Sequence, residues 1–342
     1  MKKRAFITGI TGQDGSYLAE LLVKKGYKVF GLVRQMKHDS LKYINKLYKN
    51  KDIVLIKGDL HNLGSIKKAL KIAKPDEIYN LAAQSDVSIS FIQPEETFEV
   101  NYHGFGRLVN EAIKINPKIK IYQASTSEMF GKIKPPQNEN SPFHPFSPYG
   151  QSKLKAHEDY VVGYREKRSI FICSGILFNH ESPRRGKNYV TRKITTSLVK
   201  IKLGLQDYFE LGNLDSKRDW GFASDYVEVM WEMLRQKNPQ DFVIATGQSH
   251  TVRDFVNEAV KVLGMKITWH GKGLKEVVKD ENGKVILQIN KKYYRPADTN
   301  YLIGDSKKAK RILGWRLKHS FRDLVKIMTE SDLKEIKESI SK

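Results

Sequence analysis

The sequence predicts an α/β fold with a doubly wound parallel sheet and a smaller, mixed α/β part. Through residues 3–177, short apolar segments of strand length alternate with amphipathic segments of helix length. A glycine-rich turn joins the first strand to the first helix, and polar residues follow the ends of later strands. Alternation of this kind places the strands side by side in one parallel sheet with helices on both faces. This is the Rossmann-type arrangement.

The bulk composition indicates a globular protein with room for one large or two modest domains. The chain has 342 residues, of which 40% are hydrophobic and 29% are charged. Its single cysteine, Cys173, excludes an intrachain disulfide and a cysteine-based zinc site. The apolar run after Lys2-Lys3-Arg4 is too short for a signal peptide, and no run reaches the roughly 18 apolar residues of a membrane span. We therefore expect a cytoplasmic protein that binds neither a membrane nor a metal.

The net charge of +22 raises an alternative from another class, a basic nucleic-acid-binding protein without turnover. The basic residues are spread through the chain, are mostly lysine, and stand beside acids, as in Lys275-Glu276. No zinc-finger, basic-zipper or RNA-binding motif accompanies them. A solvated, lysine-rich surface is the preferred interpretation, and we expect no nucleic acid among the partners. Steeply salt-dependent binding to DNA or RNA would favour the alternative.

The first predicted strand, residues 3–8, runs directly into a glycine loop. A helix over 17–25 and an apolar strand over 28–33 follow the loop, whose spacing is G-x-x-G-x-x-G. This order predicts a dinucleotide site, because glycines let the backbone approach a pyrophosphate at the positive end of a helix. The loop residues that we expect at the cofactor are Gly9, Thr11, Gly12, Gln13, Asp14 and Gly15.

Three later strand ends complete the expected cofactor site. Arg34 follows the second strand, where an acidic residue would bind the ribose of NAD, and a cation there suits the 2′-phosphate of NADP. Asp59-Leu60 follows a strand over 53–56, and its carboxylate can reach an adenine amine. The strand over 77–81 ends in small residues over which a cofactor can pass. The predicted set there is Leu81, Ala82, Ala83 and Ser85.

A strand over 120–125 leads into Ser125-Thr126-Ser127-Glu128, and a later helix carries Tyr149 and Lys153. Tyr149 and Lys153 are four residues apart and share a helix face, so that an ammonium lies beside a phenol. That pairing would lower the pKa of a phenol that ordinarily titrates near about 10, and would let it act as a base. The spacing also occurs by chance in many helices. Here, however, it accompanies polar residues at a parallel strand's carboxyl end, where open α/β sheets bind ligands.

Beyond a strand over 169–177 the chain becomes polar and rich in arginine. Residues 179–186 read Asn-His-Glu-Ser-Pro-Arg-Arg-Gly, and 211–221 has a similar composition. Arginine forks suit phosphate oxygens. The segment 242–247 predicts a last strand of the sheet, and Thr251 is a suitable N-cap for the helix after it.

These motifs resemble the extended short-chain dehydrogenase/reductase superfamily and, within its GDP-sugar branch, the GDP-mannose 4,6-dehydratase family. The likeness runs over nearly the whole chain. Its most specific stretches are GITGQDGSYLAELL at 9–22, LAAQS at 81–85, STSEMFG at 125–131, SPYGQSK at 147–153, ILFNHESPRRG at 176–186, LGNLDSKRDWG at 211–221 and YYRPAD at 293–298.

The resemblance implies an NADP-dependent nucleotide-sugar 4,6-dehydratase whose tightly bound cofactor is regenerated at each turnover. Tyr149, supported by Lys153, would act as the base while C4 of the hexose is oxidised, and Thr126 would hydrogen-bond O4. Glu128 would then take the C5 proton, and Glu128 or Ser127 would help the C6 hydroxyl leave as water before hydride returns to C6. The product would be GDP-4-keto-6-deoxy-mannose. A reductase or epimerase would not need this carboxylate, whose structural alternative is a helix N-terminal acid.

The resemblance also assigns binding residues and domains. It places His180 and Arg185 near the cofactor. The residues that it places at the GDP-sugar are Ser85, Glu128, Asn179, Val190, Lys193, Leu211, Gly212, Asn213, Arg218, Arg295 and Asp298. The arginine loop could instead be solvated, and Arg295 with Asp298 could be a surface ion pair. The expected NADP-binding Rossmann domain is 1–177 plus 219–246, and the expected nucleotide-sugar-binding domain is 178–218 plus 247–342.

Departures from the family pattern leave two questions open. We expect a homo-oligomer. After the second strand the chain reads Arg34-Gln35-Met36-Lys37-His38, where the family has two arginines and several serines, and this departure leaves open whether it is a homodimer or a homotetramer. The dimer would form through the helices that begin near Glu95 and Tyr149. Ser174 and Phe146 replace an asparagine and an arginine near the sugar pocket. These changes permit a larger sugar, so the alternative is a GDP-D-glycero-D-manno-heptose 4,6-dehydratase of the same mechanism.

Overall fold

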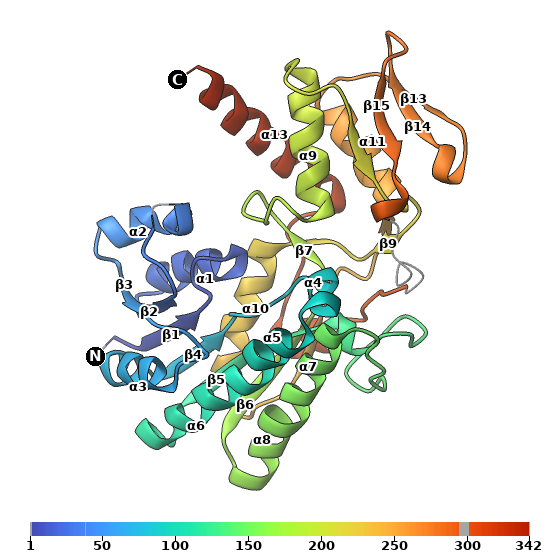
Figure 1. Ribbon diagram of the computed structural model, residues 1–342. Helices are drawn as coiled ribbons and strands as arrows, with labels where there is room; N and C mark the ends of the chain where they lie inside the picture. Colours follow the sequence, from blue (N-terminus) through green and yellow to red (C-terminus); the bar gives the residue numbers. More distant parts are fainter. Residues whose placement is uncertain (1, 38, 294–300, 342) are drawn as a thin grey trace.

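The computed structural model describes residues 2–37, 39–293 and 301–341. Within them, a seven-stranded parallel sheet has the order β11-β6-β5-β4-β1-β2-β3 (Figure 1). Its strands are β1 (Arg4–Thr8), β2 (Lys28–Val33), β3 (Ile53–Lys57), β4 (Glu77–Asn80), β5 (Lys120–Thr126), β6 (Phe171–Leu177) and β11 (Phe242–Ile244). The predicted Rossmann-type fold class is confirmed.

The sheet changes direction of growth between β1 and β4. The chain adds β2 and β3 on one side of β1 and then crosses to place β4, β5 and β6 on the other. In the register of β1, Thr8 lies opposite both Leu32 of β2 and Asn80 of β4. The carboxyl ends of β1 and β4 therefore flank the switch point, which is where doubly wound sheets bind ligands.

Side chains alternate along each strand, so apolar residues point to both faces of the sheet. Helices cover both faces. Ala5 and Ile7 of β1 pack against one layer of helices, and Phe6 packs against the other. All three residues are fully buried, and burying a phenylalanine stabilises a fold by about 1.5–3 kcal/mol. The first layer contains α1 (Gln13–Lys24), α10 (Ala223–Arg235) and α12 (Lys307–Leu313), and the second contains α3 (Leu63–Ala73) and α6 (Phe105–Ile115).

The helix expected to begin near Glu95 changes its helical period along its length. It consists of α5 (Pro94–Phe98), a π-helical segment η2 (Glu99–Gly104) and α6. Asn101 lies in η2, and its side-chain amide donates to the carbonyl oxygen of Gln84 at 3.0 Å and to Ser152 Oγ at 3.1 Å. The changed helical period thus places a buried amide between the end of β4 and the helix that carries Tyr149.

The next long helix has the same construction. It comprises α7 (Pro148–Ala156), a π-helical segment η4 (His157–Val162) and α8 (Gly163–Arg168). The two π-helical segments touch through Tyr102 and Tyr160, whose ring centroids are 5.1 Å apart. Of two further short helices, α4 (Val87–Ile92) directly precedes α5, and α2 (Asn45–Lys49) lies in the β2–β3 connection.

A second hydrophobic core lies beyond the sheet (Figure 1). It is formed by α9 (Val190–Lys202), α11 (Val252–Val262), α13 (Phe321–Ile340) and a four-stranded sheet in the order β13-β14-β15-β8. The strands are β8 (Phe209–Leu211), β13 (Ile267–His270), β14 (Val277–Asp280) and β15 (Val285–Ile289). Thr251 caps α11 through a capping box with Asp254, which confirms the predicted N-cap.

Short strand pairs connect the two parts of the chain. β7 (His180–Glu181) pairs with β10 (Gly221–Phe222), and β9 (Lys217–Arg218) pairs with β12 (His250–Thr251). Ala309 and Trp315 pack in the core beside α1 and α10, although they belong to the range expected for the second domain. The division into two domains stays a prediction.

Candidate active site

The glycine loop at the tip of β1 fits closely against the end of β4. Gly9 has a φ of +71°, and a Cβ there would lie 2.8 Å from the backbone nitrogen of Ala82. A Cβ on Gly15 would lie 2.2 Å from the carbonyl oxygen of Gly9. Thr8 Oγ1 accepts hydrogen bonds from the backbone N–H groups of Leu81 and Ala82 at 3.2 and 3.1 Å. The loop is a backbone cradle that requires glycine, and it fits a pyrophosphate at the start of a helix.

The remaining loop residues surround the first turn of α1. Gly12 is the N-cap of this helix and supplies no side-chain cap, so backbone N–H groups at the helix start are available to an anion. Gly12 is exposed and Thr11 is partly exposed, whereas Gln13 is buried. Thr11 and Gly12 thus lie on the open side of the loop, and Gln13 faces the protein.

The polar segment 179–186 holds the start of α1. Ser182 Oγ donates to Gln13 Oε1 at 2.8 Å, and Gln13 Nε2 donates to the carbonyl oxygen of His180 at 3.0 Å. Arg184 donates to a hydroxyl of α1 at 3.0 Å and forms an ion pair with a carboxylate of the same helix at 2.7 Å. Arg184 is therefore a structural clamp on the cofactor loop.

His180 and Asp14 form a mostly buried pair in this contact. Nε2 of His180 lies 2.8 Å from Oδ2 of Asp14, and Nδ1 lies 2.8 Å from the carbonyl oxygen of Phe178. Both neighbours are acceptors, and only the imidazolium can donate to both. Burial by itself would lower the pKa of His180, but attraction to Asp14 and the hydrogen bonds outweigh it, so the pKa is raised. The pKa of Asp14 is lowered, because attraction to His180 outweighs burial.

Thr126, Ser127 and Glu128 lie where β5 ends and a 3₁₀ turn, η3 (Ser127–Met129), begins. Thr126 Oγ1 accepts a hydrogen bond from the backbone N–H of Glu128 at 3.2 Å, which leaves the hydroxyl hydrogen of Thr126 to be donated elsewhere. Thr126 and Ser127 are buried, and Glu128 is partly exposed. A Cβ on Gly150 would lie 2.7 Å from the carbonyl oxygen of Glu128. The end of β5 is therefore in direct contact with the first turn of α7.

Tyr149 is the second residue of α7, and local sequence fixes its position. Ser147 is the N-cap, and its Oγ accepts from the backbone N–H of Gly150 at 3.1 Å. Pro148 occupies the first helical position, where its fixed φ suits a helix start. Thr126 acts on the phenol through a hydrogen bond, and Glu128 acts on it through its charge. The structure thus brings the predicted catalytic residues of β5 and α7 together.

The structure does not show the lowered pKa of Tyr149 that the sequence predicted from Lys153. Lys153 is buried, and its Nζ donates to the carbonyl oxygen of Ala124 at 2.8 Å. Burial lowers the pKa of Lys153 to about 8. Burial also raises the pKa of Tyr149 well above its ordinary value, although a hydrogen bond with Thr126 acts in the opposite direction. Desolvation therefore outweighs the helix-face pairing that the sequence suggested.

Arg185 connects the glycine loop with the catalytic residues. Its charge acts on Asp14 of the loop and on Tyr149 of α7. Its guanidinium lies 3.6 Å above the ring of Tyr189, and the hydroxyl of Tyr189 lies 3.0 Å from Ser85 Oγ. Tyr189 is a site residue that sequence reasoning missed. Its only signal was an aromatic ring directly after the arginine-rich segment.

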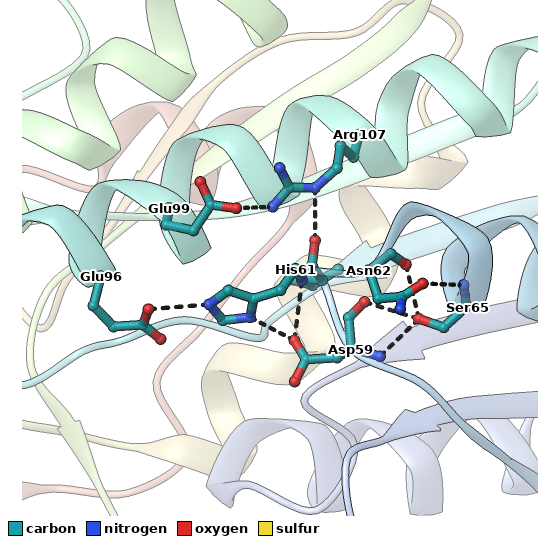
Figure 2. Close-up of polar contacts among 8 residues, drawn as sticks. Asp59, His61, Asn62, Ser65, Glu96, Glu99 and Arg107 are labelled. Atoms are coloured by element: carbon teal, nitrogen blue, oxygen red, sulfur yellow. Dashed lines mark hydrogen bonds and ion pairs between the residues drawn. The ribbon is translucent and has the colours of Figure 1, made fainter.

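The expected adenosine end of the site lies at the tips of β2 and β3. Arg34 is exposed, and its positive charge helps to lower the pKa of Asp59. Leu60 is buried, whereas Ala83 is partly exposed. The carboxylate of Asp59 contacts His61 (Figure 2), a residue that the sequence did not single out.

Among the predicted substrate residues, Lys193, Leu211 and Gly212 form one cluster. In the cluster, Nζ of Lys193 lies 3.8 Å above the ring of Tyr293, and a Cβ on Gly212 would lie 2.1 Å from the carbonyl oxygen of Tyr293. Leu211 is buried beside Gly212, and Val190 is exposed at the start of α9. Lys193 and Gly212 are thus held against one short segment, η6 (Lys291–Tyr293).

For Asn179, Asn213 and Arg218, the structure gives hydrogen bonds to backbone groups. The carbonyl oxygen of Asn179 accepts from Gly221 N at 2.9 Å. Asn213 Oδ1 accepts from Asp215 N at 3.0 Å, and Arg218 donates to the carbonyl oxygen of Lys217 at 2.8 Å. The predicted Arg295 and Asp298 lie outside the described residues.

In residues 2–37, 39–293 and 301–341, no group of three or more histidine, cysteine, aspartate or glutamate side chains is placed to hold a metal ion. No helix in the same ranges is both long and apolar enough to cross a bilayer.

The fold and the site define the class of protein. A glycine cradle at the switch point and a Tyr-x-x-x-Lys helix beside β5 are the features of an α/β enzyme of the short-chain dehydrogenase/reductase type. Residues 6–328 match the sequence model of the family described as GDP-mannose 4,6 dehydratase. The chain belongs to this family.

Curated relatives and solved structures agree with this assignment. The GDP-mannose 4,6 dehydratase of Drosophila melanogaster is 50% identical, over 97% of this chain and 86% of the relative. The Homo sapiens protein of the same name is 50% identical, over 96% of this chain and 91% of the relative. In fold, the chain is similar to dTDP-glucose 4,6-dehydratase from Bacillus anthracis in complex with NAD, with a TM-score of 0.79, 20% identity and 98% of each chain covered. It is also similar to RMD from Pseudomonas aeruginosa complexed with NADPH, with a TM-score of 0.76, 17% identity and coverage of 97% and 100%.

Proposed function

We propose that this chain converts GDP-mannose to GDP-4-keto-6-deoxy-mannose with loss of one water. The observation that carries the proposal is the contact between the end of β5, with Thr126 and Glu128, and the first turn of α7, with Tyr149. A reductase needs only a hydride donor and a proton donor, whereas elimination also needs a carboxylate beside the sugar. The family assignment and the two relatives at 50% identity support GDP-mannose as the substrate.

The cofactor in this proposal is NADP, held between the glycine loop and the tips of β2, β3 and β4. The backbone cradle at Gly9 and Gly15 suits the pyrophosphate, the exposed Arg34 suits a 2′-phosphate, and Asp59 suits an adenine amine. The NAD and NADPH named for the two structural neighbours support a nicotinamide cofactor. When bound, the nicotinamide supplies a hydride acceptor for C4 of the sugar and the hydride donor for C6.

Tyr149 is the proposed base for the first step. Its phenol oxygen takes the proton of the C4 hydroxyl, and the hydroxyl of Thr126, oriented by the N–H of Glu128, donates to the same oxygen of the sugar. Because burial raises the pKa of Tyr149, phenolate forms only when positive charge lies close to it. Lys153 and Arg185 are the cations that the site offers, and Lys153, with a pKa of about 8, is still largely protonated at neutral pH.

Glu128 is the proposed acid and base for the elimination. A ketone at C4 makes the C5 hydrogen acidic, and the carboxylate of Glu128 takes that proton. The resulting carboxylic acid gives a proton to the C6 hydroxyl, which leaves as water, with Ser127 as a hydrogen-bonding neighbour. Glu128 ends the step ionised. When hydride returns to C6, the proton that Tyr149 took from O4 is given back at C5, so that the net change is the loss of one water. Lys193, Gly212 and Arg218, with Asn179 and Asn213, are proposed to hold the GDP part.

The decisive experiment supplies the purified protein with GDP-mannose and with GDP-D-glycero-D-manno-heptose in separate reactions. We expect mass spectrometry to show a product smaller than GDP-mannose by one water. Turnover of the heptose alone would transfer the proposal to the larger sugar, and turnover of neither would contradict the dehydratase function. Steeply salt-dependent nucleic-acid binding without turnover would instead favour the other class of protein.

Glu128→Gln separates oxidation from elimination. We expect this variant to bind cofactor normally and to lose dehydration by about 100-fold or more, because the amide cannot take the C5 proton. A stalled enzyme should accumulate reduced cofactor, visible by absorbance after GDP-mannose is added. Full activity of the variant would remove Glu128 from this role. Exposed Glu95→Gln is the matched control and should retain wild-type activity.

A further inference from the structure

Two side chains, Ser65 and Arg107, hold the backbone of the turn that follows β3 (Figure 2). Ser65 Oγ accepts from the backbone N–H of Asp59 at 2.9 Å. On the opposite side, Arg107 Nε donates to the carbonyl oxygen of Leu60 at 2.8 Å, and the same guanidinium forms an ion pair with Glu99. These contacts fix the backbone of the turn. They do not fix the carboxylate of Asp59.

His61 is the group that fixes this carboxylate. Its Nδ1 lies 2.7 Å from Oδ1 of Asp59, and its backbone N–H donates to the same oxygen at 3.0 Å. Its Nε2 lies 3.1 Å from Oε2 of Glu96 on α5. Both ring nitrogens therefore face carboxylate oxygens, and only an imidazolium donates to both.

The surrounding charges reinforce the protonated form of His61. Hydrogen bonds to Asp59 and Glu96 raise the pKa of the imidazole, although partial burial acts in the opposite direction. For Asp59, burial would raise the pKa, but the hydrogen bonds from His61 and the charge of Arg34 lower it. Two further charged groups that hold the same turn, Glu99 and Arg107, form their own ion pair.

We propose that His61 is a positioning residue that holds Asp59 by Oδ1 and presents Oδ2 to the amino group of a bound adenine. The bridge to Glu96 couples this end of the cofactor site to α5, which continues through η2 into α6. The proposal rests on the proposed dinucleotide site and deepens it, and it applies to NAD and NADP alike because both carry adenine. A deprotonated ring can donate to only one of the two carboxylates, so the hold on Asp59 weakens as pH rises.

The test measures dissociation constants for NADH and NADPH by fluorescence titration, from about pH 5.5 to about pH 9, across the ordinary range of histidine. We expect His61→Gln to weaken both cofactors by about threefold to tenfold at low pH, with a smaller ratio to wild type at high pH. Taking this ratio cancels the titration of the 2′-phosphate. In Glu96→Gln the affinity should fall at a lower pH than in wild type, because one of the two negative charges that stabilise the imidazolium is lost.

Controls distinguish positioning from a general structural effect. His270→Gln removes another exposed histidine, on β13, and should leave both constants unchanged. Reduced nicotinamide mononucleotide, which lacks adenosine, should bind wild type and His61→Gln equally. This inference alone would be overturned if His61→Gln bound each cofactor as tightly as wild type at every pH. A loss of affinity confined to NADPH would also overturn it. Failure of the wild-type protein to bind either dinucleotide would overturn the cofactor proposal together with it.

Discussion

His180 and His61 each hold an aspartate of the proposed cofactor site, and the two contacts differ chiefly in their exposure to water. His180 and Asp14 are 11% and 19% exposed, whereas His61, Asp59 and Glu96 are 35%, 38% and 45% exposed. The aspartate contacts are similar in length, 2.8 and 2.7 Å. The two histidine–aspartate contacts therefore have nearly the same length, and they differ in how far water reaches them.

The surroundings give the two histidines different functions. The ring of His180 stacks on Tyr226 with centroids 4.6 Å apart, and its second nitrogen faces a carbonyl oxygen. It is part of the packing that joins segment 179–186 to the glycine loop. The ring of His61 lies between two partly exposed carboxylates. Charges inside a protein are costly to leave unpaired, whereas exposed pairs are solvated and contribute little. The comparison predicts that the His180 pair contributes to the stability of the fold, whereas the His61 contact contributes little to stability and responds to pH and salt.

The largest expected effect is that of removing the buried carboxylate. Asp14→Ala leaves the imidazolium of His180 without its counterion, and we expect a loss of roughly 3 kcal/mol in the free energy of unfolding. Urea unfolding measures the change. Asp59→Ala is the matched variant at the exposed contact and should cost less than about 1 kcal/mol. Equal losses in the two variants would show that burial does not decide the strength of these contacts.

The next effect is a pH dependence at His180. Because its folded-state pKa is raised, the pair stabilises the protein fully below the unfolded-state pKa of about 6.5. That contribution is lost as pH rises through the folded-state pKa. Asp14 has a lowered pKa, so its contribution is lost only as pH falls through that lower value. We therefore expect the stability difference between wild type and His180→Gln to be largest in mildly acidic solution and to shrink towards alkaline pH. Urea unfolding across this range measures it, and a difference that grows with pH would contradict the assignment.

Local pattern predicted much of this structure from the sequence. The bounds of β2 (Lys28–Val33) agree with the predicted strand over 28–33, because apolar periodicity determines them locally. The close fit of the glycine loop and the contact between the end of β5 and the first turn of α7 follow from the same topology, since parallel strands bring their carboxyl ends to one edge. The roles of Glu128 and Tyr149 stay a prediction.

What the sequence did not predict depends on contacts between distant segments. The four-stranded sheet joins β8 to β15 from well separated parts of the chain. The pKa of Tyr149 is set by burial, which spacing along a helix does not report. The contact of His61 with Glu96 spans 35 residues, and no local rule connects a turn residue with a helix so far along the chain.

The smallest expected effect sharpens the comparison most directly. A double-mutant cycle with His61→Gln and Glu96→Gln should give a coupling of roughly 0.5 kcal/mol in unfolding free energy at low salt, because both side chains are partly exposed. In about 1 M salt the Debye length shortens to roughly 3 Å, and the coupling should approach zero. The corresponding cycle with Asp14→Asn and His180→Gln should keep most of its coupling at the same salt concentration, since solvent ions do not reach a buried pair. A salt-resistant coupling at His61 would mean that its bridge is a fixed part of the structure, and the pH dependence of adenine binding would then lose its physical basis.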